Sequence, residues 1–535
     1  MSRTQETPTT TGYDTDYEAG QDNIRAFGLD MHNPVFFISA LLILVFVTAT
    51  LLLPQQSMDI LGGAKTWSIE TFDWLFMASS NIFILFCIWL IFSPMGKIRL
   101  GGADARPAFT RLSWVAMLFA SGMGIGLMFW SVAEPIAYYT DWYGTPLNAT
   151  PYSDRAAKLA LAATMYHWGL HAWAIYAVVG LALAFFCFNK KLPLSLRSAF
   201  YPLLGERTWG WPGHIIDILA VLATLFGLAT SLGLGAQQAS AGLHFVFGLD
   251  NTITLQIIVI AGVTLVAVMS VVRGIHGGVK ILSEVNLTVA ALFFLFVLLA
   301  GPTITLLTWI SETTLSYFHY FFQLSNWIGR DDQTWLHGWS VFYWAWWIAW
   351  SPFVGMFVAR ISRGRTVREF LLAVILVPTT ITMLWMGAFG GEALEQSQHG
   401  IGQLANGLDN IALSMFYLLD NLPWTNIVST IGIVLVLVFF VTSSDSGSLV
   451  IDSITSGGRL DAPVPQRVFW ATTEGLVASV LLYIGGKQAL TALQAGTIAT
   501  GLPFTVVLLL MCFCLYKGLR HELDVLNRTD SKPGI

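Results

Sequence analysis

Charged residues are scarce in this chain of 535 residues: 11% are Asp, Glu, Lys or Arg, whereas 55% are hydrophobic. Soluble domains carry roughly 25% charged residues, so this chain lacks the polar side chains needed to cover a globule in water. It also lacks an excess of bases, because its formal net charge is −5. That balance excludes the basic surface of a nucleic-acid-binding protein. The composition therefore predicts an integral membrane protein with no nucleic-acid partner.

Cysteine is rarer still, with four residues in the chain. Cys87, Cys187, Cys512 and Cys514 all lie in apolar runs without the spacing of a disulfide framework, so we expect reduced thiols packed between helices. The start of the chain lacks the basic residues, apolar run and cleavage site of a signal peptide. Residues 1–30 are polar and acidic, and we expect them to form a disordered cytoplasmic tail.

Long hydrophobic runs, by contrast, are abundant. Twelve apolar stretches have about the ~20 residues that a helix needs to cross a bilayer. They cover approximately residues 34–53, 72–92, 113–133, 158–188, 215–240, 252–272, 284–309, 338–360, 367–390, 426–452, 467–485 and 489–516. Of the long loops, 312–322 is amphipathic and aromatic, as expected of a helix in the membrane interface, and 391–425 is the other that can fold back. We therefore expect an all-α integral membrane protein with twelve transmembrane helices.

The basic residues are divided unevenly between alternate loops. With the N-terminus inside, 22 of the 27 Lys and Arg residues fall on the inner side. The outer side holds Lys65, Arg155, Lys158, Arg330 and Lys487. Inner loops of membrane proteins are enriched in Lys and Arg, and one missed or extra span would abolish this division. The pattern predicts a multi-pass protein of the bacterial inner membrane with both termini cytoplasmic.

Two of the spans contain residues that interrupt helices. The third carries Gly122, Gly124 and Gly126, which make a helical backbone easy to unwind, although small residues also mediate close helix packing. The eighth carries Pro352, which breaks or kinks a helix. These spans are five apart, an odd number, so they cross the membrane in opposite directions. Inverted repeats with a discontinuous helix in each half are typical of one large class of secondary transporters.

Aromatic residues cluster in the fourth and eighth spans. Residues 344–350 include four tryptophans, and at helical spacing Trp347 and Trp350 share a face, as do Trp173 and Tyr176. Tryptophan usually marks the membrane interface, but this density beside a helix interruption exceeds what an anchoring belt needs. Ring faces bind quaternary ammonium groups, each contributing roughly 0.5–2 kcal/mol once desolvated. The clusters therefore predict a site for an onium cation.

The tenth span places oxygen-bearing side chains within the membrane. Thr442, Ser443, Ser444, Asp445 and Ser446 follow a run of apolar residues. Such hydroxyls can bond their own backbone one turn back. Alternatively, together with carbonyls freed by an unwound helix, they can supply the oxygen ligands of a sodium ion.

His167 and His171 have the i, i+4 spacing of a helical metal pair. No carboxylate or cysteine lies close in sequence to complete a metal site, so we expect them to pack against aromatic residues. A membrane enzyme would need a complete nucleophile, acid–base pair or metal set. A channel would need a polar pore without paired broken helices. We therefore expect neither an enzyme nor a channel.

These motifs resemble those of the betaine/choline/carnitine transporter (BCCT) family. The resemblance spans roughly residues 30–517 and is carried by segments 122–135, 167–173, 346–355, 359–370 and 442–446. It implies the LeuT-type fold, with two five-helix inverted repeats at about 113–309 and 338–516. The implied transporter domain covers residues 31–517, followed by a short cytoplasmic tail, 518–535, and the implied assembly is a homotrimer.

The resemblance also implies functional residues at the matching motif positions. The implied substrate site is an aromatic box of Trp168, Trp173, Tyr176, Trp346, Trp347 and Trp350, next to Gly122, Gly124 and Gly126. The implied sodium site comprises Ala120, Met123, Phe439, Thr442 and Ser443, and a second one Thr224 and Phe353. No cofactor is implied besides sodium as the coupling ion.

Within the family, the residues favour a glycine betaine importer that works by sodium symport. Proton-coupled choline members tend to carry Asp where this chain has Gly126, and sodium-independent carnitine exchangers carry an Arg that residues 220–231 lack. A proton-coupled choline transporter remains an alternative, as does a carnitine or dimethylsulfoniopropionate transporter, because such a box recognises only the onium group. The C-terminal tail of about 19 residues is short for an osmosensing member.

Overall fold

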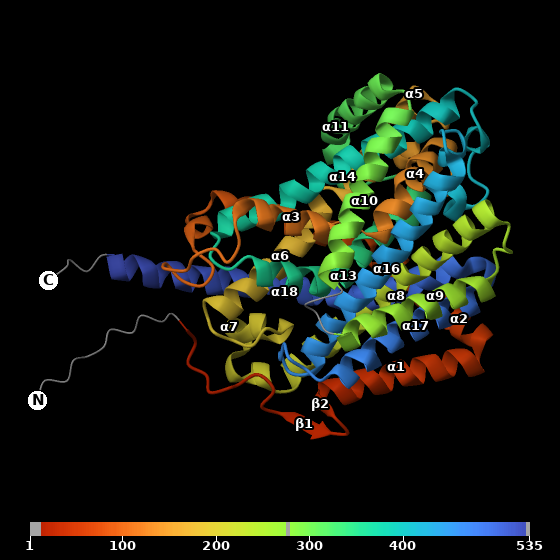
Figure 1. Cartoon of the computed structure of the whole chain (residues 1–535). Coiled ribbons are helices and arrows are strands. Elements are labelled where there is room, and N and C mark those ends of the chain that lie inside the picture. Colours follow the sequence, from red (N-terminus) through yellow and green to blue (C-terminus); the bar gives the residue numbers. More distant parts are fainter. Residues whose placement is uncertain (1–11, 123, 274–278, 531–535) are drawn as a thin grey trace, which may run out of the picture.

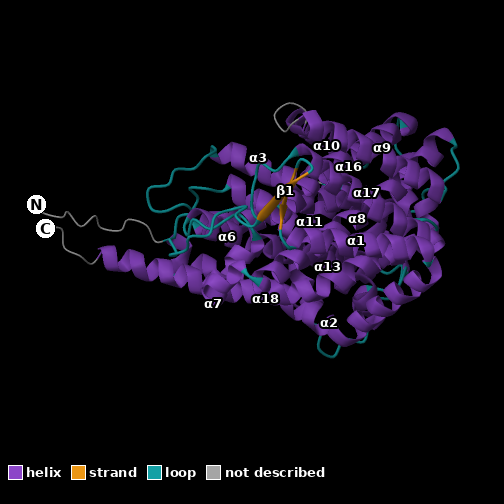
Figure 2. Ribbon diagram, turned by 90° about the horizontal axis from the view of Figure 1, so that it is seen from below, coloured by secondary structure: helices purple, strands orange, loops and turns teal. Residues whose placement is uncertain are grey.

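The computed structural model describes residues 12–122, 124–273 and 279–530, and it is helical nearly throughout (Figure 2). An antiparallel hairpin comprises β1 (Asn23–Ala26) and β2 (Leu29–His32). The first half of the chain forms α1 (Val35–Leu52), α2 (Pro54–Phe92), α3 (Arg111–Gly122), α4 (Ile125–Thr140), α5 (Asp154–Trp168), α6 (Leu170–Phe188), α7 (Tyr201–Leu204), α8 (Trp211–Phe247) and α9 (Ile253–Arg273). The second half forms α10 (Val279–Ala300), α11 (Thr303–Ser325), α12 (Gln333–Trp335), α13 (Val341–Ile361), α14 (Val367–Gln398), α15 (Ser414–Asp420), α16 (Thr425–Thr455), α17 (Val464–Gly485) and α18 (Ala489–Asp530).

Each of the twelve predicted spans falls on helix. By length and hydropathy, nine helices of the described chain can cross a membrane, or ten if the bent pair α10–α11 is one span. This number treats Val464–Arg528 as one stretch, although Gly486, at φ 48°, separates α17 from α18. It omits the third span because α3 and α4 have only 12 and 16 residues. The helices thus account for the twelve predicted crossings of an integral membrane protein.

The seventh span is shorter than predicted. α10 ends at Ala300 and not near residue 309, because Gly301 and Pro302 follow and proline has no amide hydrogen to continue the helix. α11 then runs at 114° to α10 and packs on α5 and α14 (Figure 1). The amphipathic segment 312–322 is therefore helical, as predicted, within a helix laid across one end of the bundle.

The helices pack in a two-fold pattern. The contact between α6 and α13, in the fourth and eighth spans, has its counterpart between α14 and α4, in the ninth and third. Likewise the contact of α8 with α17 has its counterpart between α16 and α9, while α8 and α16 pack on each other. If a two-fold rotation exchanges spans three to seven with spans eight to twelve, each contact between the two sets must occur twice, as these contacts do. The packing thus agrees with two five-helix repeats, whose odd offset makes them inverted.

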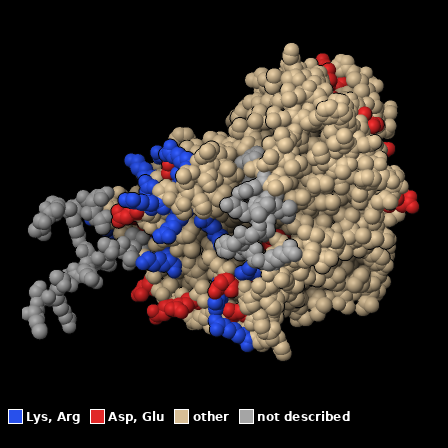
Figure 3. All heavy atoms as spheres, in the orientation of Figure 1, with Lys and Arg blue, Asp and Glu red and all other residues tan. Residues whose placement is uncertain are grey.

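Charged side chains gather at the two ends of the molecule. Figure 3 shows Lys and Arg, together with some acidic side chains, at the end from which α18 extends, further acidic side chains at the opposite end, and an uncharged zone between them. This zone matches the hydrocarbon core of a bilayer. α18 continues as a helix to Asp530, so much of the predicted C-terminal tail is helical.

The prediction of a disordered N-terminal tail is wrong for residues 12–30, which the structure places in defined contacts with the rest of the chain. The Arg197 guanidinium, fully buried, donates to the hydroxyl of Tyr17 at 2.9 Å. Asn23 donates to the carbonyl of Ser456 at 2.9 Å, and Arg459 lies 3.0 Å from the carboxylate of Asp30. Composition misled the prediction, because a few specific contacts to distant parts of the chain fold this polar segment.

Candidate functional site

The third span is interrupted where its glycines predicted. α3 ends at Gly122 and α4 begins at Ile125. Between them Gly124 is fully extended, with φ −165° and ψ −177°. The first amide groups of α4 are therefore left without partners in their own helix, and they lie inside the bundle.

A second interruption, which the sequence analysis missed, lies in the fourth span. α5 ends at Trp168 and α6 begins at Leu170, with Gly169 between them at φ −103° and ψ −134°. A side chain at position 169 would lie 2.6 Å from the carbonyl oxygen of Met165 and 2.9 Å from the hydroxyl of Tyr317. The same hydroxyl accepts a hydrogen bond from the freed amide of Leu170 at 3.1 Å. Gly169, inside the aromatic motif, was the available signal for this break.

The two interruptions meet at Gly126. A Cβ atom at this position would collide with Cη2 of Trp168 and would lie 3.3 Å from Cη2 of Trp346. Glycine is therefore required here for the indole of Trp168 to lie against the start of α4. Gly126 therefore has a steric role in the arrangement of the box.

The eighth span is not broken at Pro352, contrary to the prediction. α13 runs continuously from Val341 to Ile361. Pro352 has no amide hydrogen for the carbonyl of Ile348, but the hydroxyl of Ser351 donates to that carbonyl at 2.7 Å. Neighbouring hydroxyls allow proline inside membrane helices in this way.

The aromatic residues predicted from the fourth and eighth spans come together around Trp347. Its ring centroid lies 5.4 Å from that of Trp168, 6.2 Å from that of Trp173 and 4.9 Å from that of Tyr176. Trp168 also meets Trp346 edge to face, with centroids 6.1 Å apart. The structure thus brings the aromatic residues of the fourth and eighth spans into one cluster.

The cluster also contacts α8. The indole nitrogens of Trp346 and Trp350 lie 3.4 and 2.9 Å from the carbonyl oxygen of Gly227. A Cβ at position 227 would lie 3.0 Å from the ring of Trp350 and 3.1 Å from Ala349. Glycine in α8 thus lets α13 approach closely enough for both indoles to donate to one carbonyl.

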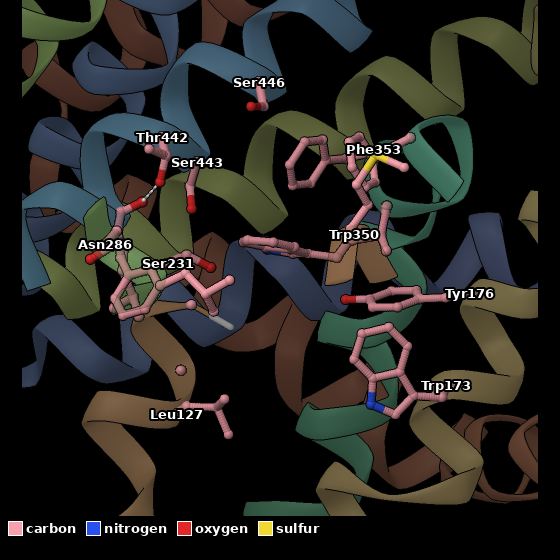
Figure 4. A pocket seen from close by; sticks show the side chains of 18 of the residues that line it. Leu127, Trp173, Tyr176, Ser231, Asn286, Trp350, Phe353, Thr442, Ser443 and Ser446 are labelled. Atoms are coloured by element: carbon pink, nitrogen blue, oxygen red, sulfur yellow. Dashed lines mark hydrogen bonds between the residues drawn. The ribbon is translucent and has the colours of Figure 1, made fainter. Parts of the chain in front are cut away.

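All six predicted box residues line one cavity of about 740 Å³. Figure 4 shows Trp173, Tyr176 and Phe353 on one side, Ser231, Asn286, Thr442 and Ser443 on the other, and Trp350 between them. Gly124 and Gly126 also line the cavity. Its lining, within the described chain, includes no Asp, Glu, Lys or Arg. The arrangement suits a small solute with a methylated cationic end and a part that accepts hydrogen bonds.

Three of the residues predicted for the first sodium site, Phe439, Thr442 and Ser443, line this cavity. The hydroxyl of Thr442 donates to the carbonyls of Val438 and Phe439, at 3.0 and 3.1 Å, and its lone pairs are left to accept a cation. Ala120 and Met123 lie outside the residues whose side chains the structure describes.

Of the two residues predicted for a second sodium site, only one lines the cavity. Phe353 lines it, whereas Thr224 does not. Thr224 is fully buried in α8, and its hydroxyl has no hydrogen-bond partner among the described residues. The second site stays a prediction.

Behind Trp168 lies Glu134 of α4. It is fully buried. Its Oε2 accepts hydrogen bonds from the indole of Trp168 at 2.9 Å and from the hydroxyl of Tyr343 at 2.5 Å. Its Oε1 accepts one from Tyr138 at 2.8 Å and lies 2.7 Å from Nδ1 of His167. Four side chains from three helices therefore converge on one carboxyl group.

The two histidines are held in hydrogen-bond networks. Nε2 of His167 lies 2.8 Å from the hydroxyl of Ser340, and Nε2 of His171 lies 3.1 Å from the amide oxygen of Asn81. Ser340, His167 and Glu134 follow the order of a hydrolytic triad, but Ser340 is fully buried and does not line the cavity. Across the described residues, no group of three or more His, Cys, Asp or Glu side chains could hold a metal ion. The histidines orient neighbouring side chains.

Comparison with known proteins gives consistent matches. The profile of the betaine/carnitine/choline family transporters matches residues 34–524. A glycine betaine/proline/choline/ectoine transporter of Vibrio parahaemolyticus is 61% identical over 95% of this chain and 91% of its own. Glycine betaine transporter 1 of the same organism is 61% identical over 95% of this chain and 97% of its own. The glycine betaine transporter of Acinetobacter baylyi is 41% identical over 92% and 74%, respectively. Among solved structures, the manganese transporter of Eremococcus coleocola matches with a TM-score of 0.42 at 16% identity, over 77% of this chain and 83% of that one.

Proposed function

The chain belongs to the betaine/carnitine/choline transporter family of multi-pass membrane transporters, and we propose that it imports glycine betaine by sodium symport. One observation carries the substrate assignment: aromatic rings and neutral hydrogen-bonding groups face each other across one cavity. Rings bind the trimethylammonium group, and Ser231, Asn286 and Ser443 can donate to a carboxylate. The uncharged lining favours a zwitterion over a net cation.

The sodium assignment rests on the hydroxyls of α16. Thr442 and Ser443 line the same cavity as the extended Gly124, so an ion bound there would contact both the broken helix and the substrate site. Sodium is a hard cation that prefers such oxygen ligands. We expect the transporter to work as a homotrimer in the bacterial inner membrane.

Choline is the second candidate substrate, because one relative at 61% identity is named as a choline as well as a glycine betaine transporter. That name also includes proline and ectoine. The box distinguishes these ligands poorly, because it recognises the onium group and not the remainder of the molecule.

Uptake by proteoliposomes tests the proposal. Labelled glycine betaine, choline, proline, ectoine, carnitine and dimethylsulfoniopropionate are compared with a sodium gradient, with a proton gradient and with neither. We expect glycine betaine uptake that requires sodium. Choline uptake driven by protons alone, without glycine betaine uptake, would contradict both the substrate and the coupling ion.

A further inference from the structure

The cavity lining includes no charged side chain among the described residues, yet a carboxyl group lies directly behind one wall. Trp168 separates the two: its ring lines the cavity and its Nε1 donates to Oε2 of Glu134 at 2.9 Å. Glu134 is fully buried, and among the described residues no Lys or Arg lies within salt-bridge distance of it. The carboxyl group of Glu134 therefore has no Lys or Arg side chain among the described residues to pair with.

The hydrogen bonds around Glu134 favour a carboxylate over a carboxylic acid. Trp168 can only donate, and the hydroxyls of Tyr343 and Tyr138 lie at donating distance, 2.5 and 2.8 Å. His167 completes the arrangement with Nδ1 as donor and Nε2 as acceptor for Ser340. Each carboxylate oxygen then receives two hydrogen bonds, which is how a buried anion is stabilised without a salt bridge.

We propose that Glu134 is the counter-charge of the onium group and acts on it through Trp168. A hydrogen bond to an anion increases the electron density of the indole, and an electron-rich ring face attracts a cation more strongly. The negative charge also orients a zwitterion, with its ammonium end against Trp168 and its carboxylate towards the hydroxyl wall. Glu134 is thus a specificity-determining residue that never touches the substrate. This inference rests on the proposed function and deepens it.

A pair of ligands that differ only in charge tests the inference. Glycine betaine and 3,3-dimethylbutanoate have the same shape, but a carbon atom replaces the ammonium nitrogen in the second. Binding of both to the purified protein in saturating sodium gives the onium preference, the ratio of their affinities. We expect Glu134→Gln to lower this preference at least about fivefold, whereas Glu392→Gln, which removes another buried carboxylate away from the cavity, preserves it.

The outcomes separate the two proposals. If wild-type protein shows no onium preference, the proposed function fails. If wild-type protein shows it and Glu134→Gln lowers both affinities by the same factor, Glu134 only positions Trp168 and the counter-charge inference is overturned.

A second pair of variants avoids removing Glu134, whose loss could prevent folding. Trp168→Phe deletes the N–H that reaches the carboxylate, whereas Trp347→Phe deletes an indole N–H that has no hydrogen-bond partner among the described residues. Both variants keep an aromatic ring in the box. We expect the onium preference to fall at least about threefold further in Trp168→Phe than in Trp347→Phe. Equal preferences in the two variants would overturn the inference.

Discussion

The position of one indole depends on the absence of one side chain. Trp168 ends α5, and its ring lies where any Cβ at position 126 would be. The ring joins the cavity to Glu134, so its displacement would change both the shape of the aromatic box and its charge environment. The position of the Trp168 ring therefore depends on glycine at position 126.

We expect Gly126→Ala to weaken glycine betaine binding by at least ~1 kcal/mol, because the added methyl group displaces the indole of Trp168. Gly126→Asp should lower glycine betaine transport as well, but in addition improve choline recognition relative to Gly126→Ala, because its charge attracts a net cation. Affinities of both ligands for both variants separate the steric effect from the electrostatic one. Wild-type affinity in Gly126→Ala would show that Trp168 can adjust at no cost.

At the scale of elements, α13 shows how a helix tolerates proline. The carbonyl of Ile348 would be unsatisfied next to Pro352, and the hydroxyl of Ser351 satisfies it. The aromatic residues Trp346, Trp347 and Trp350 precede this point on the same helix. The continuity of α13 thus keeps them at helical spacing.

Ser351→Ala should destabilise the protein by about 1–3 kcal/mol, the cost of an unsatisfied buried carbonyl. Thermal unfolding of the purified protein in detergent measures this. The double variant Ser351→Ala/Pro352→Ala is the control, because the new amide hydrogen at position 352 can donate to Ile348. If the double variant is no more stable than Ser351→Ala, the hydroxyl is not what supports the helix.

The hydroxyls of α16 allow a test of coupling. Replacing Thr442 by Val and Ser443 by Ala should raise the sodium concentration for half-maximal uptake at least about tenfold, because two oxygen ligands are lost. Thr430→Val is the matched control, since Thr430 lies on the exposed side of α16 and also bonds its own backbone. An unchanged sodium dependence in the double variant would remove these hydroxyls from the ion site.

The β1–β2 hairpin is held by contacts that depend on pH. Burial, and then the charge of Arg197, lowers the pKa of His32 from 6.5 to about 3. His32 is therefore neutral in the folded protein, and its Nε2 accepts from Nη1 of Arg197 at 2.9 Å; Nδ1 of His214 lies 3.3 Å from the same nitrogen. Undocking restores the ordinary pKa, so protonation favours the undocked hairpin. The stability of this contact is complete above about pH 6.5 and is lost as the pH falls towards 3.

Hydrogen exchange of residues 23–32, corrected for the intrinsic effect of pH, should accordingly be faster at pH 5 than at pH 7.5. The variant His32→Gln keeps a hydrogen-bonding side chain without a titrating group, so its exchange should depend less on pH than that of the wild type; His214, on the same guanidinium nitrogen, is unchanged in the variant. The same pH dependence in both proteins would show that another group controls docking.

At the scale of the whole molecule, the uneven distribution of basic residues sets the predicted orientation. Lys191 follows α6 at the Lys- and Arg-rich end, and Lys487 lies in the turn between α17 and α18. A membrane-impermeant maleimide should therefore label Lys487→Cys in intact spheroplasts, and Lys191→Cys only after permeabilisation. Cys87, Cys512 and Cys514 are buried, and both variants are made with the half-buried Cys187 replaced by Ser so that background labelling is low. The opposite labelling pattern would reverse the orientation.

The resemblance drawn from the motifs is confirmed by the family match over residues 34–524, and the relatives are named transporters and not enzymes. In the structure, two sets of five helices pack in corresponding pairs, and the cavity is lined by residues of α3, α4, α5, α6, α8, α10, α13 and α16.

The sequence by itself determined the membrane spans, the break at Gly124 and the aromatic pairs within the fourth and eighth spans. Each follows from local physics: lipid requires apolar helices, extended glycine costs little, and residues at i+3 share a face. Only the tertiary structure decided the break at Gly169, the folding of residues 12–32 and the surroundings of Glu134. In each of these, the deciding partner comes from another part of the chain: the hydroxyl of Tyr317 for the freed amide of Leu170, the guanidinium of Arg197 for the N-terminal segment, and donors from three helices for one carboxylate. A buried polar group is stable only when such partners surround it, and the sequence lists the partners without showing which of them meet.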